Sequence, residues 1–229
     1  MKPKDKKELK KRLTTVVERH WKNYFDGVLK RKRPLLSPSQ TNFTMAGYPV
    51  DIYLMSRLGR SLDSSRGNLW EKILVTLSNF FNEKTYSKVA DLKLKTTGKK
   101  WIIDLAFERG GITYLIEIKL GANLDNKKAK SEATALKDRK DCLLDNNIAS
   151  EVKTYLGVVC LANGESSPVD WVMGRVSEGF ERSEVLVERE LFDFVTNNTN
   201  VFDFIVNVVQ PIVMKGELDV IQTIKNKYL

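Results

Sequence analysis

Residues 101–120 have the sequence WIIDLAFERGGITYLIEIKL, which contains the clearest pattern of strands in the chain. Residues 101–107 and 112–120 are rich in β-branched and aromatic side chains, which favour strands. Gly110 and Gly111 lie between the two runs and predict a tight hairpin turn. Both runs are apolar over most of their length, which is typical of strands that are buried on both faces. The sequence therefore predicts an antiparallel strand pair at the centre of a sheet.

Three charged residues, Asp104, Glu117 and Lys119, interrupt these apolar runs. A charge in a buried strand is costly unless it is paired or bound to a metal ion. Residues two apart on a strand face the same side, so Glu117 and Lys119 project together, and Asp104 lies at a similar height if the hairpin closes at the glycines. Two carboxylates can share a Mg²⁺ ion, and a lysine beside them can stabilise charge that develops on a phosphate. On spacing alone, a solvent-exposed pair between Glu117 and Lys119 is the simpler interpretation.

The segments on either side of this hairpin are expected to be mainly helical. Apolar periodicity and breaker residues predict the elements. Before the hairpin, the expected elements are helices over 8–30 and from Ser64 or Ser65 to about Phe81, and a possible strand over 89–95. After it, they are a helix over 125–144, a strand over 154–161, mixed structure around 171–180, and helices over 186–195, over 199–214 with a break at Pro211, and over 217–229. This order predicts an α/β fold with a central mixed β-sheet flanked by helices and a helical N-terminal extension, in a single domain spanning residues 1–229.

The composition excludes several classes of site. The chain has 229 residues, of which 42% are hydrophobic and 29% charged, so it can bury a core. A single histidine, His20, excludes sites built from several histidines and leaves carboxylates, lysine and a metal ion for catalysis. Two cysteines, Cys142 and Cys160, are too few for a disulfide framework or a four-thiolate zinc site. No apolar run is long enough to span a membrane and no apolar segment follows the lysine-rich N-terminus, so we expect a cytoplasmic protein with no membrane partner.

The formal net charge of +9 is concentrated at the N-terminus. Residues 1–33 contain 13 lysines and arginines against four acidic residues, whereas the rest of the chain is balanced. A local basic segment suits a polyanion such as nucleic acid. A solvated terminus explains the same charges, so charge alone does not establish DNA binding.

The pattern ID at residues 103–104 and EIK at residues 117–119, on a β-hairpin that follows an α-helix, resembles the core of the PD-(D/E)xK nucleases. The resemblance implies that Asp104 and Glu117 bind Mg²⁺ and that Lys119 assists phosphodiester hydrolysis.

The sequence departs from the family's pattern at one position and offers one further candidate ligand. Ile103 stands where the family has proline, which leaves the metal ligand after it intact. Many members add a carboxylate from the preceding core helix, and Glu71 is placed for that role. An exposed glutamate on the surface of the helix is an equally open interpretation of Glu71.

A wider resemblance, over residues 64–205, is to type II restriction endonucleases. It rests on KLGAN at residues 119–123, on the long helix that follows, and on LGVV at residues 156–159. It is greatest to enzymes that cut GGNCC-type sites, and it implies a homodimer that makes a double-strand break in a palindromic site of double-stranded DNA. The resemblance divides the chain into a basic helical extension (1–36), a restriction-endonuclease-like catalytic core (64–165) and a C-terminal helical, specificity-determining part (166–229).

Candidate DNA contacts are basic and amide side chains near this core. They lie at the expected start of a helix, just after the active-site strand, on the helix that follows it, and beside Gly174. These candidates are Arg66, Asn68, Asn123, Lys127, Lys130, Arg139 and Arg175. Such side chains can contact phosphates or enter the major groove, although a solvated helix face explains any one of them as well.

Two other functions remain open from the sequence. A nuclease with the same core could act on DNA structure or in repair rather than at a specific site. A non-catalytic protein could instead bind DNA through its basic N-terminal helix, with steep salt dependence and no metal-dependent nicking.

Overall fold

The structure, a computed structural model, describes residues 1–29, 50–86, 103–120, 126–159 and 168–228. Two compact units divide the chain between them. The sheet unit comprises Glu71–Asp203, and the helical unit comprises Lys2–Trp70 together with Phe204–Leu229. Among the described residues, no helix is long and apolar enough to cross a membrane.

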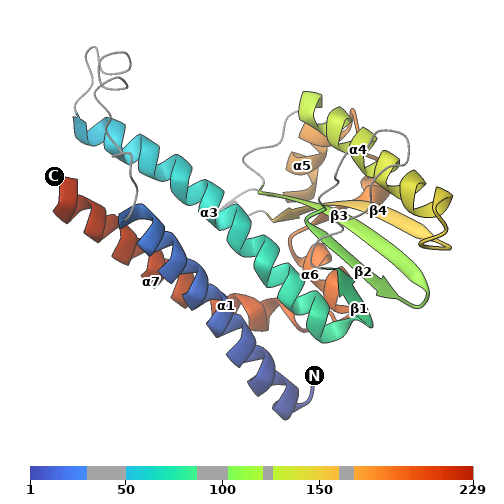
Figure 1. Cartoon of the computed structure of the whole chain (residues 1–229), viewed down its shortest axis with the longest axis horizontal. Helices are drawn as coiled ribbons and strands as arrows, with labels where there is room; N and C mark the ends of the chain where they lie inside the picture. The colour runs from blue at the N-terminus through green and yellow to red at the C-terminus, as the bar shows by residue number, and fades with distance from the viewer. Residues whose placement is uncertain (30–49, 87–102, 121–125, 160–167, 229) are drawn as a thin grey trace. The chain divides into compact units, whose positions relative to one another are not determined.

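A five-stranded mixed sheet forms the centre of the sheet unit (Figure 1). Its strands lie in the order β1-β2-β3-β4-β5. The pairs β1–β2 and β2–β3 are antiparallel, and the pairs β3–β4 and β4–β5 are parallel. With helices packed on the sheet, the predicted α/β class is confirmed. The elements are β1 (Lys84–Tyr86), β2 (Leu105–Arg109), β3 (Ile112–Leu120), α4 (Asn126–Asp145), β4 (Val152–Val159), α5 (Pro168–Val176), β5 (Val185–Val187) and α6 (Arg189–Thr196).

The predicted hairpin is formed by β2 and β3, and its turn lies at the predicted glycines. Gly110 and Gly111 have φ values of 60° and 77°, a region that side-chain-bearing residues adopt with strain. Leu105 pairs with Ile116, which sets the register of the two strands. The strand begins at Leu105, so Asp104 lies immediately before β2 rather than on it, and residues 101–102 lie outside the described part.

The two faces of the sheet have different cores because strand side chains alternate between them. Leu115, Leu156 and Val158 pack with apolar residues of α4 and α5 on one face. On the other face Tyr155 lies against Phe194 of α6, with 4.8 Å between the ring centroids. The odd-numbered positions of β3 therefore face α4, which is the side that carries residues 117 and 119.

Gly157 on β4 shows how closely α6 approaches the sheet. A Cβ atom at this position would lie 2.9 Å from Ile116 Cγ2 and 2.9 Å from Leu191 Cδ1, too close for van der Waals contact. Glycine in the middle of a strand is thus explained by the packing of α6 rather than by an unusual backbone conformation.

The helical unit contains α1 (Pro3–Leu29), the first part of α3 (Val50–Phe81) and most of α7 (Phe202–Tyr228). The predicted helix over 8–30 is confirmed, and its apolar stripe is buried at Leu9, Leu13 and Val17. Gly216 on α7 allows close contact with Trp21, because a Cβ there would lie 2.5 Å from the indole ring.

Two predicted helix boundaries were wrong. The helix expected to begin at Ser64 or Ser65 begins at Val50, because Leu62 and Leu69 continue its buried face through the polar stretch between them. The break expected at Pro211 does not occur, and α7 runs continuously from Phe202 to Tyr228. A proline inside a helix removes one backbone hydrogen bond, and the burial of residues on both sides of it offsets that loss.

The other predicted elements agree with the structure in part. Helix α4 and strand β4 match the predicted ranges 125–144 and 154–161 to within about two residues, and α5 lies before and within the region of mixed structure. The predicted helix over 186–195 is in fact strand β5 followed by α6. The possible strand over 89–95 lies outside the described residues.

Candidate active site

Asp104, Glu117 and Lys119 come together at the end of the β2–β3 pair. The Ile118 amide donates a hydrogen bond to Asp104 Oδ2 at 2.8 Å, which holds Asp104 beside β3. Glu117 and Lys119 project from β3 on the face that α4 covers, and their side chains are in contact, with Lys119 Nζ 2.6 Å from Glu117 Oε1. The predicted common face of Glu117 and Lys119 is confirmed, and the register places Asp104 next to Glu117.

Glu117 is buried and both of its carboxylate oxygens contact cations. Lys119 donates to Oε1, and Arg139 Nη1 on α4 donates to Oε2 at 2.9 Å. Lys119 also contacts Glu132 of α4, with 2.9 Å between Nζ and Oε1. The side chains of Arg139, Glu117, Lys119 and Glu132 thus form a continuous row of alternating charge, in which each charge is balanced by a neighbour.

The surroundings shift the pKa values of the two carboxyl groups in opposite directions. Burial, followed by repulsion from Glu117, raises the pKa of Asp104 to about 7 from an ordinary 3.8. Burial also opposes ionisation of Glu117, but its hydrogen bonds and charge interactions with Lys119 and Arg139 lower its pKa overall. Burial likewise disfavours charged Lys119, yet Glu117 and Glu132 raise its pKa above the ordinary value. Carboxyl groups with divergent pKa values are typical of catalytic centres.

Glu71 on α3 belongs to the same electrostatic environment. Its pKa is raised by burial and then by the negative charge of Glu117, while Lys119 partly offsets these effects. Among the described residues, however, no group of three or more His, Cys, Asp or Glu side chains is arranged to hold a metal ion. The structure therefore does not gather Glu71 with Asp104 and Glu117 into one ligand set, and Glu71 as a ligand stays a prediction.

A family comparison bears on this arrangement. A sequence model of the HinfI type II restriction endonucleases matches residues 93–212, which is more than half of the chain. The chain belongs to this family. The resemblance to restriction endonucleases expected from the sequence is confirmed, and the region that matches the HinfI family contains Asp104, Glu117 and Lys119 but not Glu71.

Comparisons with solved structures and with curated proteins give no further support for the family assignment. A solved structure titled restriction endonuclease PspGI–substrate DNA complex is similar at a TM-score of 0.39, with 14% identity over 75% of this chain and 72% of that chain. A likeness this weak carries no argument about the present chain. Among curated proteins, no match was found.

The predicted DNA contacts on α4 do not share one environment. Lys130 is exposed and pairs with Glu178 at 2.9 Å, whereas only 18% of the Arg139 side chain is exposed, because it contacts Glu117. Lys127 lies on the first turn of α4, and Asn123 lies outside the described residues. Contact with DNA stays a prediction for Asn123, Lys127, Lys130 and Arg139.

Arg175 lies at the end of α5, where its guanidinium carbon is 3.8 Å from the ring centroid of Trp171. It also donates a hydrogen bond to the Trp171 carbonyl at 3.2 Å. These contacts fix the side chain to its own helix, and its predicted contact with DNA is not tested by them.

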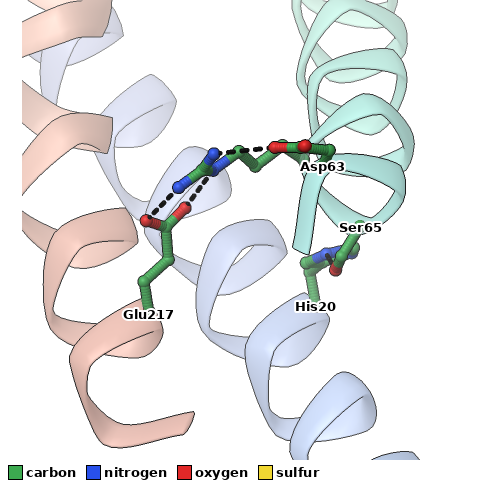
Figure 2. A network of polar contacts seen from close by, with 5 residues as sticks. His20, Asp63, Ser65 and Glu217 are labelled. Carbon is green, nitrogen blue, oxygen red and sulfur yellow. Dashed lines mark hydrogen bonds and ion pairs between the residues drawn. The ribbon is translucent and has the colours of Figure 1, made fainter. Parts of the chain in front are cut away.

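Arg66 and Asn68 were expected at a helix start, but they lie in the middle of α3, so no helix N-terminus is present there to bind a phosphate. In the helical unit the Arg66 guanidinium contacts Glu217 Oε1 at 2.6 Å and Asp63 at 3.0 Å (Figure 2). The same unit contains the buried His20, whose Nε2 atom lies 2.8 Å from Ser65 Oγ (Figure 2).

Glu132 was missed in the sequence because its partner is distant along the chain. The available signal was the apolar stripe of α4, in which residues 129, 136 and 143 are buried and residue 132 occupies the same face. A charged residue within a buried helical stripe requires a partner of opposite charge, and the partner of Glu132 is Lys119.

Proposed function

We propose that this chain is a Mg²⁺-dependent, site-specific endonuclease that hydrolyses phosphodiester bonds of double-stranded DNA. One observation carries the proposal: Asp104, Glu117 and Lys119 meet at one end of a strand pair inside the region that matches the HinfI family. A nuclease needs a site for a hard cation and a positive charge near the phosphate, and these residues supply both.

The donor chemistry fits Mg²⁺. Both side chains are carboxylates, and burial, followed by repulsion from Glu117, raises the pKa of Asp104, so a divalent cation bound there would favour its ionised form. Mg²⁺ binds one or two protein carboxylates and takes its other ligands from water and phosphate oxygens, so Asp104 and Glu117 suffice, with Glu71 proposed as a further ligand. When bound, the ion supplies Lewis acidity at the phosphodiester.

Lys119 acts in this proposal as a protonated amine. The negative charges of Glu117 and Glu132 raise its pKa, which disfavours the neutral form that a general base requires. Its ammonium group instead stabilises the negative charge that develops on the phosphate during attack by water. Glu132 holds the amine from the side of α4 and keeps it within reach of Glu117.

Cleavage of plasmid DNA tests the catalytic assignment. Wild-type protein is expected to cut DNA with Mg²⁺ and not with EDTA, and Asp104→Ala and Lys119→Ala are expected to lose at least about 100-fold in rate. Lys153→Ala is the matched control, because Lys153, on β4, forms an exposed pair with Glu151, the residue before that strand. Cleavage by Asp104→Ala at the wild-type rate would refute the assignment.

Site specificity is tested by the products of the same digestion. Discrete fragments whose sequenced ends share a motif would support a type II enzyme and would reveal whether the site is of the GGNCC type. Uniform degradation, or cutting only at branched or damaged DNA, would instead support a structure-selective or repair nuclease with the same core.

We also propose that the active species is a homodimer, because the type II restriction endonucleases that the chain resembles cut both strands of a palindromic site. Light scattering with and without a short duplex would show a mass of two chains of 26.2 kDa each. A monomer that nicks one strand at a time would contradict the dimer and leave the nuclease assignment intact.

A further inference from the structure

The face of α4 that lies on the sheet carries two charged residues in an otherwise apolar stripe. Residues 129, 132, 136, 139 and 143 recur three and four positions apart, which places them on one side of a helix. Ala129, Leu136 and Leu143 of this stripe are buried in the core. Glu132 and Arg139 occupy the two positions between them, so their charges are directed at the sheet rather than at solvent.

Arg139 differs from the exposed basic residues of the same helix in burial and in partner. Its side chain is 18% exposed, compared with 64% for Lys130, and it contacts Glu117, which is 9% exposed. A half-buried arginine is stabilised by a carboxylate close by, and Glu117 Oε2 lies 2.9 Å from Arg139 Nη1. Since Lys119 takes the other oxygen, Arg139 and Lys119 together fix the plane of the Glu117 carboxylate.

We propose that Arg139 is a positioning residue that orients Glu117 for catalysis and is not a contact to DNA. This inference rests on the proposed function, because it gives Arg139 a part in the same site. Its basis is the contact between the half-buried Arg139 guanidinium and the buried Glu117, on a helix whose apolar residues anchor it to the sheet.

Removal of Arg139 is expected to affect turnover rather than DNA binding. In Arg139→Met, Glu117 Oε2 loses its partner, and Lys119 becomes the remaining cation in contact with that carboxylate among the described residues. Small errors in the placement of catalytic groups lower rates strongly, so we expect kcat to fall about 10- to 100-fold with KM for DNA unchanged. Arg139→Lys keeps the charge but not the planar donor group, and it should restore part of kcat.

DNA affinity measured without metal separates this role from a phosphate contact. Fluorescence anisotropy with a labelled duplex in EDTA should give the same affinity and the same salt dependence for wild type and Arg139→Met. Loss of a phosphate contact would weaken binding and reduce the slope of log K against log salt by about 0.9. Lys137→Met is the control, because Lys137 is an exposed basic residue on the same helix.

A thermal double-mutant cycle tests the coupling to Glu117 without any need for activity. Arg139→Met should lower the Tm, because it leaves a buried carboxylate with less compensation, and Arg139→Met with Glu117→Gln should recover most of that loss. The same cycle on the exposed Lys130–Glu178 pair should show little coupling.

These measurements distinguish failure of the proposed nuclease function from failure of the proposed positioning role of Arg139. If wild-type protein fails to cut any DNA with Mg²⁺, the proposed function fails, while an intact thermal coupling still establishes the Arg139–Glu117 contact. The positioning role is overturned if Arg139→Met weakens metal-free DNA binding with a smaller salt slope, retains kcat, or shows no coupling to Glu117. Partial rescue by Arg139→Lys with unchanged affinity supports it.

Discussion

Replacement of Asp104 by asparagine is expected to stabilise the metal-free protein while it abolishes cleavage. Asp104 is half-buried beside Glu117, and this burial, followed by repulsion from Glu117, raises its pKa to about 7. An asparagine at this position has nearly the same shape, and its carbonyl oxygen can accept the hydrogen bond that the Ile118 amide now donates at 2.8 Å. The substitution therefore removes the charge without removing the contact.

The size and sign of the effect follow from the pKa difference. A carboxyl group with an ordinary pKa of 3.8 and a folded-state pKa of about 7 binds more protons in the folded protein, so stability falls as pH rises between these values and is constant above them. At face value the ionised form costs about 4 kcal/mol near pH 8, and about half of that cost is already present near pH 5.5. Because local relaxation and water around this half-buried side chain reduce that cost, we expect Asp104→Asn to gain about 1–3 kcal/mol near pH 8.

Thermal unfolding followed by circular dichroism in EDTA is the direct assay. A gain of 1 kcal/mol corresponds to a rise in Tm of about 2–4 °C for a chain of this size. The rise should be larger near pH 8 than near pH 5.5, and added Mg²⁺ should stabilise the wild type but not the variant. Asp138→Asn on the exposed side of α4 is the control. If Asp104→Asn were no more stable than wild type near pH 8, the carboxylate would not be strained and the reasoning would fail.

Three further predictions concern other parts of the chain. Gly157→Ala should destabilise the sheet unit by about 1–3 kcal/mol through overpacking, measured by urea denaturation, and an unchanged midpoint would contradict the close approach of α6. Glu217→Gln should lower stability by about 1 kcal/mol, because Arg66 loses a two-point ion pair; a calorimetric Tm equal to that of wild type would count against it. If the basic N-terminal helix binds DNA, replacing exposed Lys7 and Lys10 by glutamine should lower affinity and reduce the salt slope by up to about 0.9 per residue, as measured by anisotropy.

The central hairpin and the grouping of its charged side chains were predictable because their signals are local. The two apolar runs and the glycine pair determine β2, β3 and the turn between them. The placement of Glu117 and Lys119 on one face follows from the alternation of side chains along a strand. Asp104 was placed at the correct height because a tight turn fixes the register of the strands that it joins.

The elements that sequence reasoning missed depend on partners that are distant in the chain. Strands β1 and β5 have three residues each, too few to show an alternating pattern, and each is held by pairing with a longer strand. Helix α3 contains Gly59 and a polar stretch at 63–66 that favour a loop, but packing of its apolar residues in the helical unit keeps it helical.

For Glu132 and Arg139 on α4, the sequence predicts the helix face but not the partners, because those partners are distant in the chain. The spacing of Glu132 and Arg139 shows that they share the buried face of a helix, yet the sequence contains many carboxylates and cations that could pair with them. The parallel arrangement of β3 and β4 connected by α4 selects Lys119 and Glu117 as their partners. Arg139, predicted as a DNA contact, contacts Glu117 in the structure, and its role in the site is the positioning role proposed above.

Asp104 and Glu117 have different hydrogen-bond partners, and this difference predicts how Mg²⁺ binding depends on pH. Lys119 and Arg139 each contact one oxygen of Glu117 and lower its pKa, whereas the hydrogen bond that Asp104 receives comes from the uncharged Ile118 amide. Asp104 therefore carries a proton over much of the range below its pKa of about 7, and the Mg²⁺ ion proposed above would have to displace that proton to bind. Apparent Mg²⁺ affinity is then expected to rise with pH up to about 7 and to level off above it, because the folded site by that stage has already lost its proton.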